Sequence, residues 1–220
     1  MTHGDERAKW SDMIPLTMIV AEQLGALYAV RLLVREIGLT AALKVFGGVA
    51  ADQAKGEPWR KLGPAPDRND ALSRRQIGGA VILERRLRCA VSAEKARALV
   101  GEVVKYASVE FLKRSIPALN KHELISMPPE KRDSFLTGIK DKFFNSEAEL
   151  SLNGDESLDL RITRCRFVEL LAAIGEADMA PVFCEGDGEF FAAHQDGIIL
   201  ERPEKLSTGG KICDFRFRWK

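Results

Sequence analysis

Two runs of alternating apolar and polar residues near the C-terminus constrain the fold more than any other feature. The first spans residues 158–162, and the second spans Cys213–Trp219 after a Ser-Thr-Gly-Gly sequence that is typical of a turn. Because successive side chains of a strand point to opposite faces, each run predicts a strand with one face on a core. A shorter run at 198–200 precedes the turn, so we expect a terminal β-hairpin with Cys213 facing inward.

Two helices are expected between these strands. Cys165 ends the first strand and begins a helix that stops at Gly175, since glycine accepts the left-handed C-cap conformation at little cost. Pro181 is suited to begin a second helix, which would align four residues along one face: Cys184, Asp187, Phe191 and His194. Gly186 and Gly188 each disfavour a helix by about 1 kcal/mol relative to alanine, so a tight loop near a ligand stays open as an alternative.

The N-terminal half begins with a strongly apolar segment, residues 13–33. Glu22 and Arg31 interrupt it, and charges inside a membrane cost about 2.5–3.5 kcal/mol each. We therefore expect a buried helix from about Ser11 to Gly38 instead of a membrane span. This helix would serve the core or a subunit contact, which makes a homo-oligomer formed through it one expected arrangement.

Helical patterns continue to about residue 145, and residues 147–157 then lead into the strands. The predicted fold class is α+β, with an N-terminal helical layer followed by a C-terminal region that holds a small, largely antiparallel sheet. The predicted division is a flexible tail at 1–10, a helical region at 11–125 and an α+β region at 126–220 that carries the site. The boundary between the last two regions is soft.

Two isolated residues in the helical half have more than one interpretation. Trp59 stands in a Pro- and Gly-rich loop at 56–69, where it could cover a ligand, but an indole that anchors the loop to the core is the commoner arrangement. Cys89 has no motif around it, so we interpret it as a small buried apolar residue on a helix that spans 70–92.

Composition excludes several classes of protein. The net charge of +1 over 220 residues gives no drive toward nucleic acid or an anionic membrane. The four cysteines lack paired spacing, so we expect free thiols in the cytoplasm, with neither a disulfide framework nor a structural zinc site. Three cysteines with an aspartate or a histidine could still bind zinc, which remains a minor alternative to a site without cofactor.

The C-terminal motifs carry a resemblance to a known family. They are Thr163-Arg164-Cys165 before a helix, Cys184-Glu185-Gly186-Asp187, and Gly210 followed by Cys213-Asp214-Phe215-Arg216-Phe217. In combination these motifs resemble the C-terminal half of the L-2-amino-thiazoline-4-carboxylic acid hydrolase family. The resemblance implies a hydrolase that acts on a non-peptide C–N bond of a small cyclic substrate, by opening a cyclic amidine or lactam ring.

The resemblance also suggests roles for particular residues. Opening an amidine ring requires water to add at the amidine carbon, which calls for a base or for a thiol that attacks first. Asp187 is the candidate for amidinium binding or general base, and Cys184 is the candidate nucleophile or site-lining thiol. The other candidate residues would bind substrate, the two arginines by pairing with an acidic group: Cys165, Cys213, His194, Arg164 and Arg202.

Two further hypotheses belong to other functional classes. The C-terminal half also resembles the vinyl-reductase-type ligand-binding domains, which would make the chain a small-molecule-binding protein without catalysis. Alternatively, the chain is a structural or oligomerising protein built on the apolar helix at 13–33. For the candidate residues themselves, the alternative to a site is that the cysteines are buried small residues and that Asp187 braces a turn.

Overall fold

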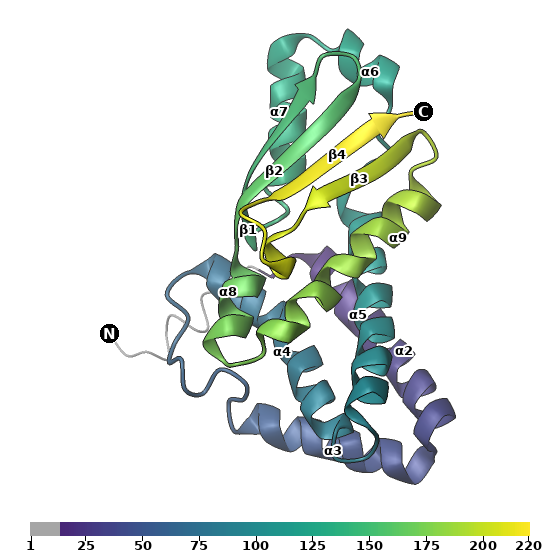
Figure 1. Cartoon of the computed structure of the whole chain (residues 1–220), viewed down its shortest axis with the longest axis vertical. Coiled ribbons are helices and arrows are strands. Elements are labelled where there is room, and N and C mark those ends of the chain that lie inside the picture. The colour runs from purple at the N-terminus through teal and green to yellow at the C-terminus, as the bar shows by residue number, and fades with distance from the viewer. Residues whose placement is uncertain (1–13) are drawn as a thin grey trace. The chain divides into compact units, whose positions relative to one another are not determined.

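The computed structural model describes residues 14–220, and the chain divides into two compact units, one ending at Phe111 and one running from Leu112 to Lys220. The expected tail at 1–10 and the expected helix start near Ser11 lie outside the described residues. Helices make up the described part of the first unit (Figure 1), and the last of them continues a short way into the second: α2 (Leu16–Ile37), α3 (Leu39–Ala54), α4 (Arg68–Leu87) and α5 (Ala93–Ser115).

Helix α2 packs one face into the first unit and leaves the other face open. Gly25 lies so close to α5 that an added Cβ would come within 2.8 Å of the Ala107 Cβ, and the Tyr28 and Tyr106 rings stack with centroids 4.4 Å apart. The helix ends at Gly38, as the sequence predicts. It is the one described helix long and apolar enough to span a membrane, a property that core helices share, and 33% of its most apolar window is buried.

The arginines of α4 pair with acidic residues within the first unit. Arg75 binds Glu22 at 2.6 Å, and Arg86 binds Asp52 of α3. Glu84 is fully buried, and its Oε1 accepts hydrogen bonds from Arg88 at 2.9 Å and Arg97 at 2.5 Å. The basic pattern along α4 therefore reflects internal ion pairs that hold α4 to its neighbouring helices.

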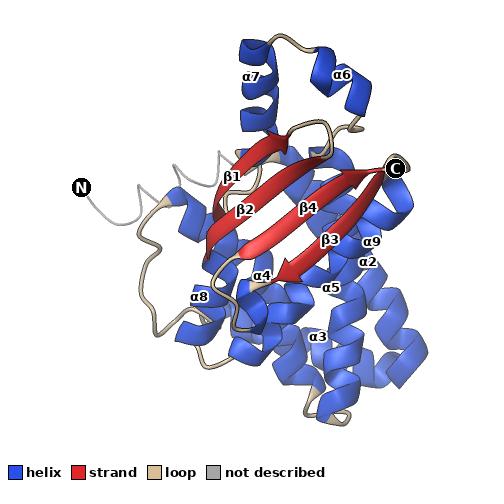
Figure 2. Cartoon of the chain, turned by 45° about the horizontal axis from the view of Figure 1, so that its top comes forward, coloured by secondary structure: helices blue, strands red, loops and turns tan. Residues whose placement is uncertain are grey.

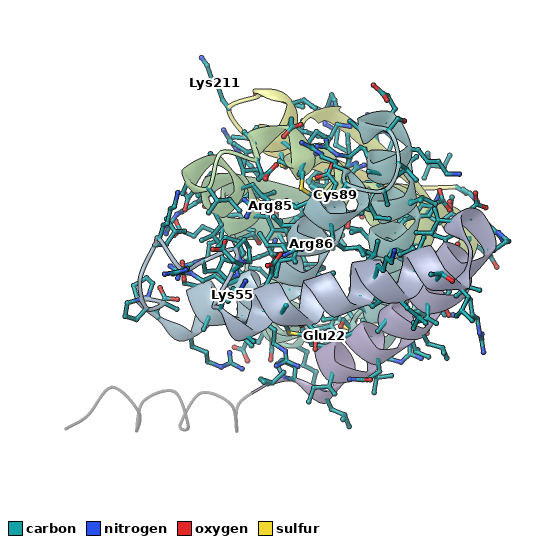
Figure 3. The ribbon with its side chains drawn as sticks, turned by 90° about the horizontal axis from the view of Figure 1, so that it is seen from below. Glu22, Lys55, Arg85, Arg86, Cys89 and Lys211 are labelled. Carbon is teal, nitrogen blue, oxygen red and sulfur yellow. The ribbon has the colours of Figure 1, made fainter. Side chains whose placement is uncertain are left out.

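Trp59 anchors the loop between α3 and α4, as the sequence predicts. Its Nε1 donates a hydrogen bond to the Arg74 carbonyl oxygen at 3.1 Å, and Gly78 leaves room for the indole. The expectation that Cys89 is buried is wrong: α4 ends at Leu87, and Cys89, whose side chain is labelled in Figure 3, is exposed in the turn that follows. The helix expected over 70–92 therefore ends before it reaches Cys89.

The second unit contains an antiparallel sheet of four strands in the order β1-β2-β4-β3 (Figure 2), which confirms the α+β class. Its strands are β1 (Ser146–Asn153), β2 (Ser157–Cys165), β3 (Ile198–Glu204) and β4 (Cys213–Trp219). Its helices are α6 (Lys121–Ser126), α7 (Pro129–Lys140), α8 (Arg166–Ala173), α9 (Glu185–His194) and the 3-10 helices η1 (Ala177–Cys184) and η2 (Leu206–Thr208). Strand β1 occupies most of the stretch that the sequence treats only as a lead-in.

The two faces of the sheet differ sharply. In the register of β2 with β4, Ile162 pairs with Cys213, Leu160 with Phe215 and Leu158 with Phe217; all of these side chains are buried except Ile162, which is half-buried. Asp214 alternates to the opposite face, as predicted, where its carboxylate accepts a hydrogen bond from Arg216 at 2.7 Å. The β3–β4 hairpin and the inward position of Cys213 are confirmed.

The helix expected to begin at Pro181 begins four residues later. Residues 177–184 form η1, and α9 starts at Glu185 with Cys184 as its N-cap residue. Gly186 and Gly188 lie within α9, so the alternative of a tight loop is also wrong. Burial of Phe190 and Phe191 explains why the helix tolerates two glycines, since packing of an apolar face outweighs intrinsic propensity.

Candidate functional site

Five chemically active side chains of the second unit come together where η1, α9, β3, η2 and β4 meet. They are Cys184 at the start of α9, Asp187 in its first turn, Arg202 on β3, Ser207 on η2 and Cys213 at the start of β4. The hairpin brings β3 and η2 against the α9 N-terminus, so residues distant in sequence become neighbours. The hydrogen bonds and charges within this group decide what it can do chemically.

Arg202 connects the group. Its Nη1 donates to the Cys184 carbonyl oxygen at 2.8 Å and to Asp187 Oδ2 at 3.0 Å. Its guanidinium also lies 5.3 Å from the centre of the Phe215 ring, a cation–π distance. Its Nε and Nη2 have no hydrogen-bond partner among the described residues and are not enclosed. One edge of Arg202 therefore fixes the start of α9, and the donors on its other edge are unpaired among the described residues, on a side chain that is 14% exposed.

Asp187 is a partly shielded carboxylate with one occupied oxygen. Its side chain is 25% exposed; Oδ2 accepts the bond from Arg202, while Oδ1 has no partner among the described residues and is not enclosed. Burial raises the pKa of Asp187 to about 6, and the Arg202 charge partly offsets that effect. Asp187 is thus ionised at neutral pH but can hold a proton only slightly below it.

Cys184, unlike Asp187, is protonated at neutral pH. Burial raises the pKa of its thiol to about 11; the nearby Ser207 hydroxyl lowers it, the Asp187 charge raises it further and Arg202 lowers it. The Sγ atom lies 3.5 Å from Ser207 Oγ and 3.8 Å from the Ala180 carbonyl oxygen. The thiol therefore keeps its proton throughout the neutral range.

The other two cysteines of the second unit lie near this group. Cys213 is buried, and its Sγ accepts a hydrogen bond from the Leu206 amide at 3.3 Å. Cys165 is the N-cap residue of α8. Burial raises the pKa of both thiols, and in each case the Asp187 charge contributes to the increase, so both lie within electrostatic reach of that carboxylate.

Two predicted substrate-binding residues do not join the group. His194 is exposed at the last residue of α9, with its ring centroid 5.9 Å from that of Phe190. Arg164 is exposed on β2, where it binds Glu147 at 2.8 Å and Glu169 at 2.7 Å, and these two bonds raise its pKa. The positions of His194 and Arg164 therefore do not support the substrate-binding roles predicted for them, because neither residue contacts the group.

Ser207 is the residue that sequence reasoning missed. It stands in the Ser-Thr-Gly-Gly sequence that we interpret only as a turn, and no local pattern indicates that its hydroxyl reaches Cys184. The turn itself is tightly built: an added Cβ on Gly210 would lie 2.6 Å from the Glu204 Cγ, and Glu204 Oε1 accepts a hydrogen bond from the Lys211 amide. Glycine at position 210 therefore allows the turn that carries Ser207.

The site residues do not form a metal centre by geometry. Within residues 14–220, no group of three or more His, Cys, Asp or Glu side chains is arranged to hold a metal ion. What the group offers is a carboxylate that can accept a proton, a thiol that can donate one and an arginine with free donors.

The chain matches a known protein family over more than half of its length. The family model described as L-2-amino-thiazoline-4-carboxylic acid hydrolase matches residues 74–217. The chain belongs to this hydrolase family. No curated protein and no solved structure gave a significant match.

The match to the L-2-amino-thiazoline-4-carboxylic acid hydrolase family extends well beyond the C-terminal motifs. It begins inside α4, so it includes the buried Glu84 as well as Cys184, Asp187, Arg202 and Cys213. The similarity to this family therefore extends into the first unit, where the sequence motifs alone show only a common helical character.

Proposed function

We propose that the protein is a hydrolase that opens a small cyclic amidine or lactam by cleaving a non-peptide C–N bond, with Asp187 as the general base. The observation that carries this proposal is the state of the Asp187 carboxylate. Arg202 holds one oxygen, the other oxygen is open, and the pKa of about 6 lets the group accept a proton and release it again near neutral pH. Membership of the hydrolase family supports the reaction type.

The reaction can be written with Asp187 Oδ1 as the base. A water molecule attacks the ring amidine or amide carbon while one of its protons passes to Oδ1, and a new C–O bond forms. The resulting tetrahedral intermediate expels the ring nitrogen, which takes up one proton as the C–N bond breaks. Hydrolysis is then balanced, because water has supplied a hydroxyl group to carbon and a proton to nitrogen.

A covalent route through Cys184 has less support. Attack by sulfur requires the thiolate, and a thiol with a pKa of about 11 is ionised in only about one molecule in ten thousand at pH 7. Cysteine nucleophiles are usually activated by a neighbouring histidine. His194 lies at the opposite end of α9 from Cys184, so it does not provide that activation.

Arg202 is the best-placed of the predicted residues for holding an acidic group of the substrate. Its Nε and Nη2 are free among the described residues, and they form the edge that matches a carboxylate in a bidentate pair. Cys165 and Cys213 are uncharged, weakly polar neighbours of Asp187, the first half-buried and the second buried. This arrangement suits a small substrate with a carboxylate on one side of an amidine or amide ring.

A substrate panel tests the proposal. The purified protein should convert at least one member of a panel of cyclic amidines and lactams, with and without a carboxylate, to the ring-opened product detected by mass spectrometry. Binding of panel members without any turnover would instead identify a non-catalytic ligand-binding domain of the vinyl-reductase type.

A further inference from the structure

We propose that Cys184 is the general acid of the ring-opening reaction and that Ser207 positions its thiol. On this view the thiol delivers its proton to the departing ring nitrogen and does not attack carbon. The inference rests on the proposed hydrolase function and assigns the half of the proton transfer that Asp187 does not perform. Ser207 lies outside the sequence motifs that predicted the site.

The positions of the two groups fit complementary roles. Cys184 and Asp187 are three residues apart at the start of α9, so their side chains lie about one helical turn apart on the same side. Arg202 Nη1 contacts both residues, through the Cys184 carbonyl and through Asp187 Oδ2. Both side chains therefore belong to the first turn of α9, and this is where the proposal places the substrate.

Their surroundings also separate the two groups as acid and base. At neutral pH the Asp187 carboxylate is ionised and can take a proton, while the Cys184 thiol is protonated and can give one. Two neighbouring groups whose environments separate their proton affinities in this way form the arrangement that general acid–base catalysis needs.

The structure provides for the thiolate that remains after proton transfer. Ser207 Oγ, 3.5 Å from the sulfur, can turn its hydroxyl proton toward the thiolate, and the Arg202 charge acts in the same direction. The sulfur loses a proton as the C–N bond breaks, and the ring nitrogen gains it. Asp187, protonated in the first step, then returns a proton to the thiolate through water, so both groups regain their starting state.

A series of substrates that differ only in the basicity of the leaving nitrogen tests this role. A general acid matters most when the leaving group is strongly basic. Cys184→Ala should lower kcat by about 100-fold or more on the substrate with the most basic leaving nitrogen, and by less than about threefold on the least basic one. Asp187→Asn should reduce turnover of every member of the series, because attack by water needs the base in each case.

Ser207 is tested by the same series. Ser207→Ala should produce a smaller loss with the same dependence on the leaving group, and Ser207→Thr, which keeps a hydroxyl, should restore most of the activity. The matched controls are Cys89→Ala, which removes an exposed thiol of the first unit, and Thr208→Ala, which removes the hydroxyl next to Ser207 in η2. Both controls should retain parental turnover across the series, and circular dichroism should show that every variant is folded.

The possible outcomes separate the two proposals. Equal loss of turnover by Cys184→Ala across the series would overturn the acid role, and so would a trapped covalent adduct on Cys184, which would make the sulfur a nucleophile. Either result would leave the hydrolase function standing. If the parent protein opens no ring in the substrate panel, the proposed function fails and the role of Cys184 fails with it.

Discussion

Glu84 in the first unit and Asp187 in the second are both acids bound to arginine, but they are bound in different ways. Glu84 is fully buried and receives two arginine hydrogen bonds on Oε1. Asp187 receives one arginine bond on Oδ2, and its other oxygen stays open. The first arrangement joins α4 to α5, whereas the second holds a carboxylate in place and leaves it able to react.

The comparison shows that an ion pair is not by itself a sign of function. Removing one partner of a buried pair leaves an uncompensated charge, so such a pair is costly to break whatever its role. A functional carboxylate needs an accessible oxygen and a proton affinity near the working pH, and Asp187 has both. Substitutions at the two acids should therefore affect different quantities.

The largest expected effect is on catalysis at Asp187. Asp187→Asn keeps the shape of the side chain but removes the base, so turnover should fall by at least about 100-fold on a substrate found in the panel. Asp214→Asn is the matched control, because Asp214 also pairs with an arginine but lies on the outer face of the sheet. A folded Asp187→Asn variant with parental turnover would show that this carboxylate is structural, like Glu84.

The next effect is on stability at Glu84. Glu84→Gln weakens two charge-assisted hydrogen bonds inside the first unit, so the free energy of unfolding should fall by about 2 kcal/mol. Activity per folded molecule should stay unchanged. Glu102→Gln, which removes an exposed acid paired with Lys105, should change stability by less than about 1 kcal/mol in the same denaturant titration. If Glu84→Gln lowered turnover but not stability, Glu84 would be a functional acid and the contrast with Asp187 would be wrong.

A third prediction concerns the pH dependence of kcat/KM. The base must be ionised, so kcat/KM should rise about tenfold per pH unit below pH 6 and level off above it, following the pKa of Asp187. Arg202 lowers this pKa, so Arg202→Met should move the rising limb to higher pH. Arg216→Met, on the outer face of the sheet, is the control and should leave the limb in place. If the rising limb of the pH profile stays in place in the Arg202 variant, the ionisation that it reports does not belong to Asp187.

The smallest expected effect compares the cysteines of the two units. Cys89 is exposed, whereas Cys165, Cys184 and Cys213 are shielded and have raised pKa values. A thiol reagent at pH 8 should therefore label Cys89 first in the native protein, and denaturation without reductant should expose four reactive thiols. Fewer than four would indicate a disulfide, and rapid native labelling of Cys184 would show that its thiol is more acidic than its surroundings imply.

The sequence alone determined the elements with strong local signals. Alternation predicted β2 and β4 with Cys213 inside and Asp214 outside, and Gly38 and Gly175 marked helix ends, because side-chain alternation and left-handed backbone are local properties. The motifs around Cys184 and Asp187 also predicted the family correctly. Local patterns failed at η1 and at Cys89, where a short 3-10 helix and an early helix end shift the register of the side chains.

Tertiary structure decided which of the candidate residues meet. Arg164 and Arg202 look equivalent in the sequence, but strand alternation and pairing place Arg164 beside Glu147 and Glu169, and the β3–β4 hairpin places Arg202 against Asp187. Ser207 reaches Cys184 across 23 residues of sequence. Such contacts depend on how the chain returns on itself, and the raised pKa values of Asp187 and Cys184 depend on the water that these contacts exclude, so neither can be derived from residue spacing.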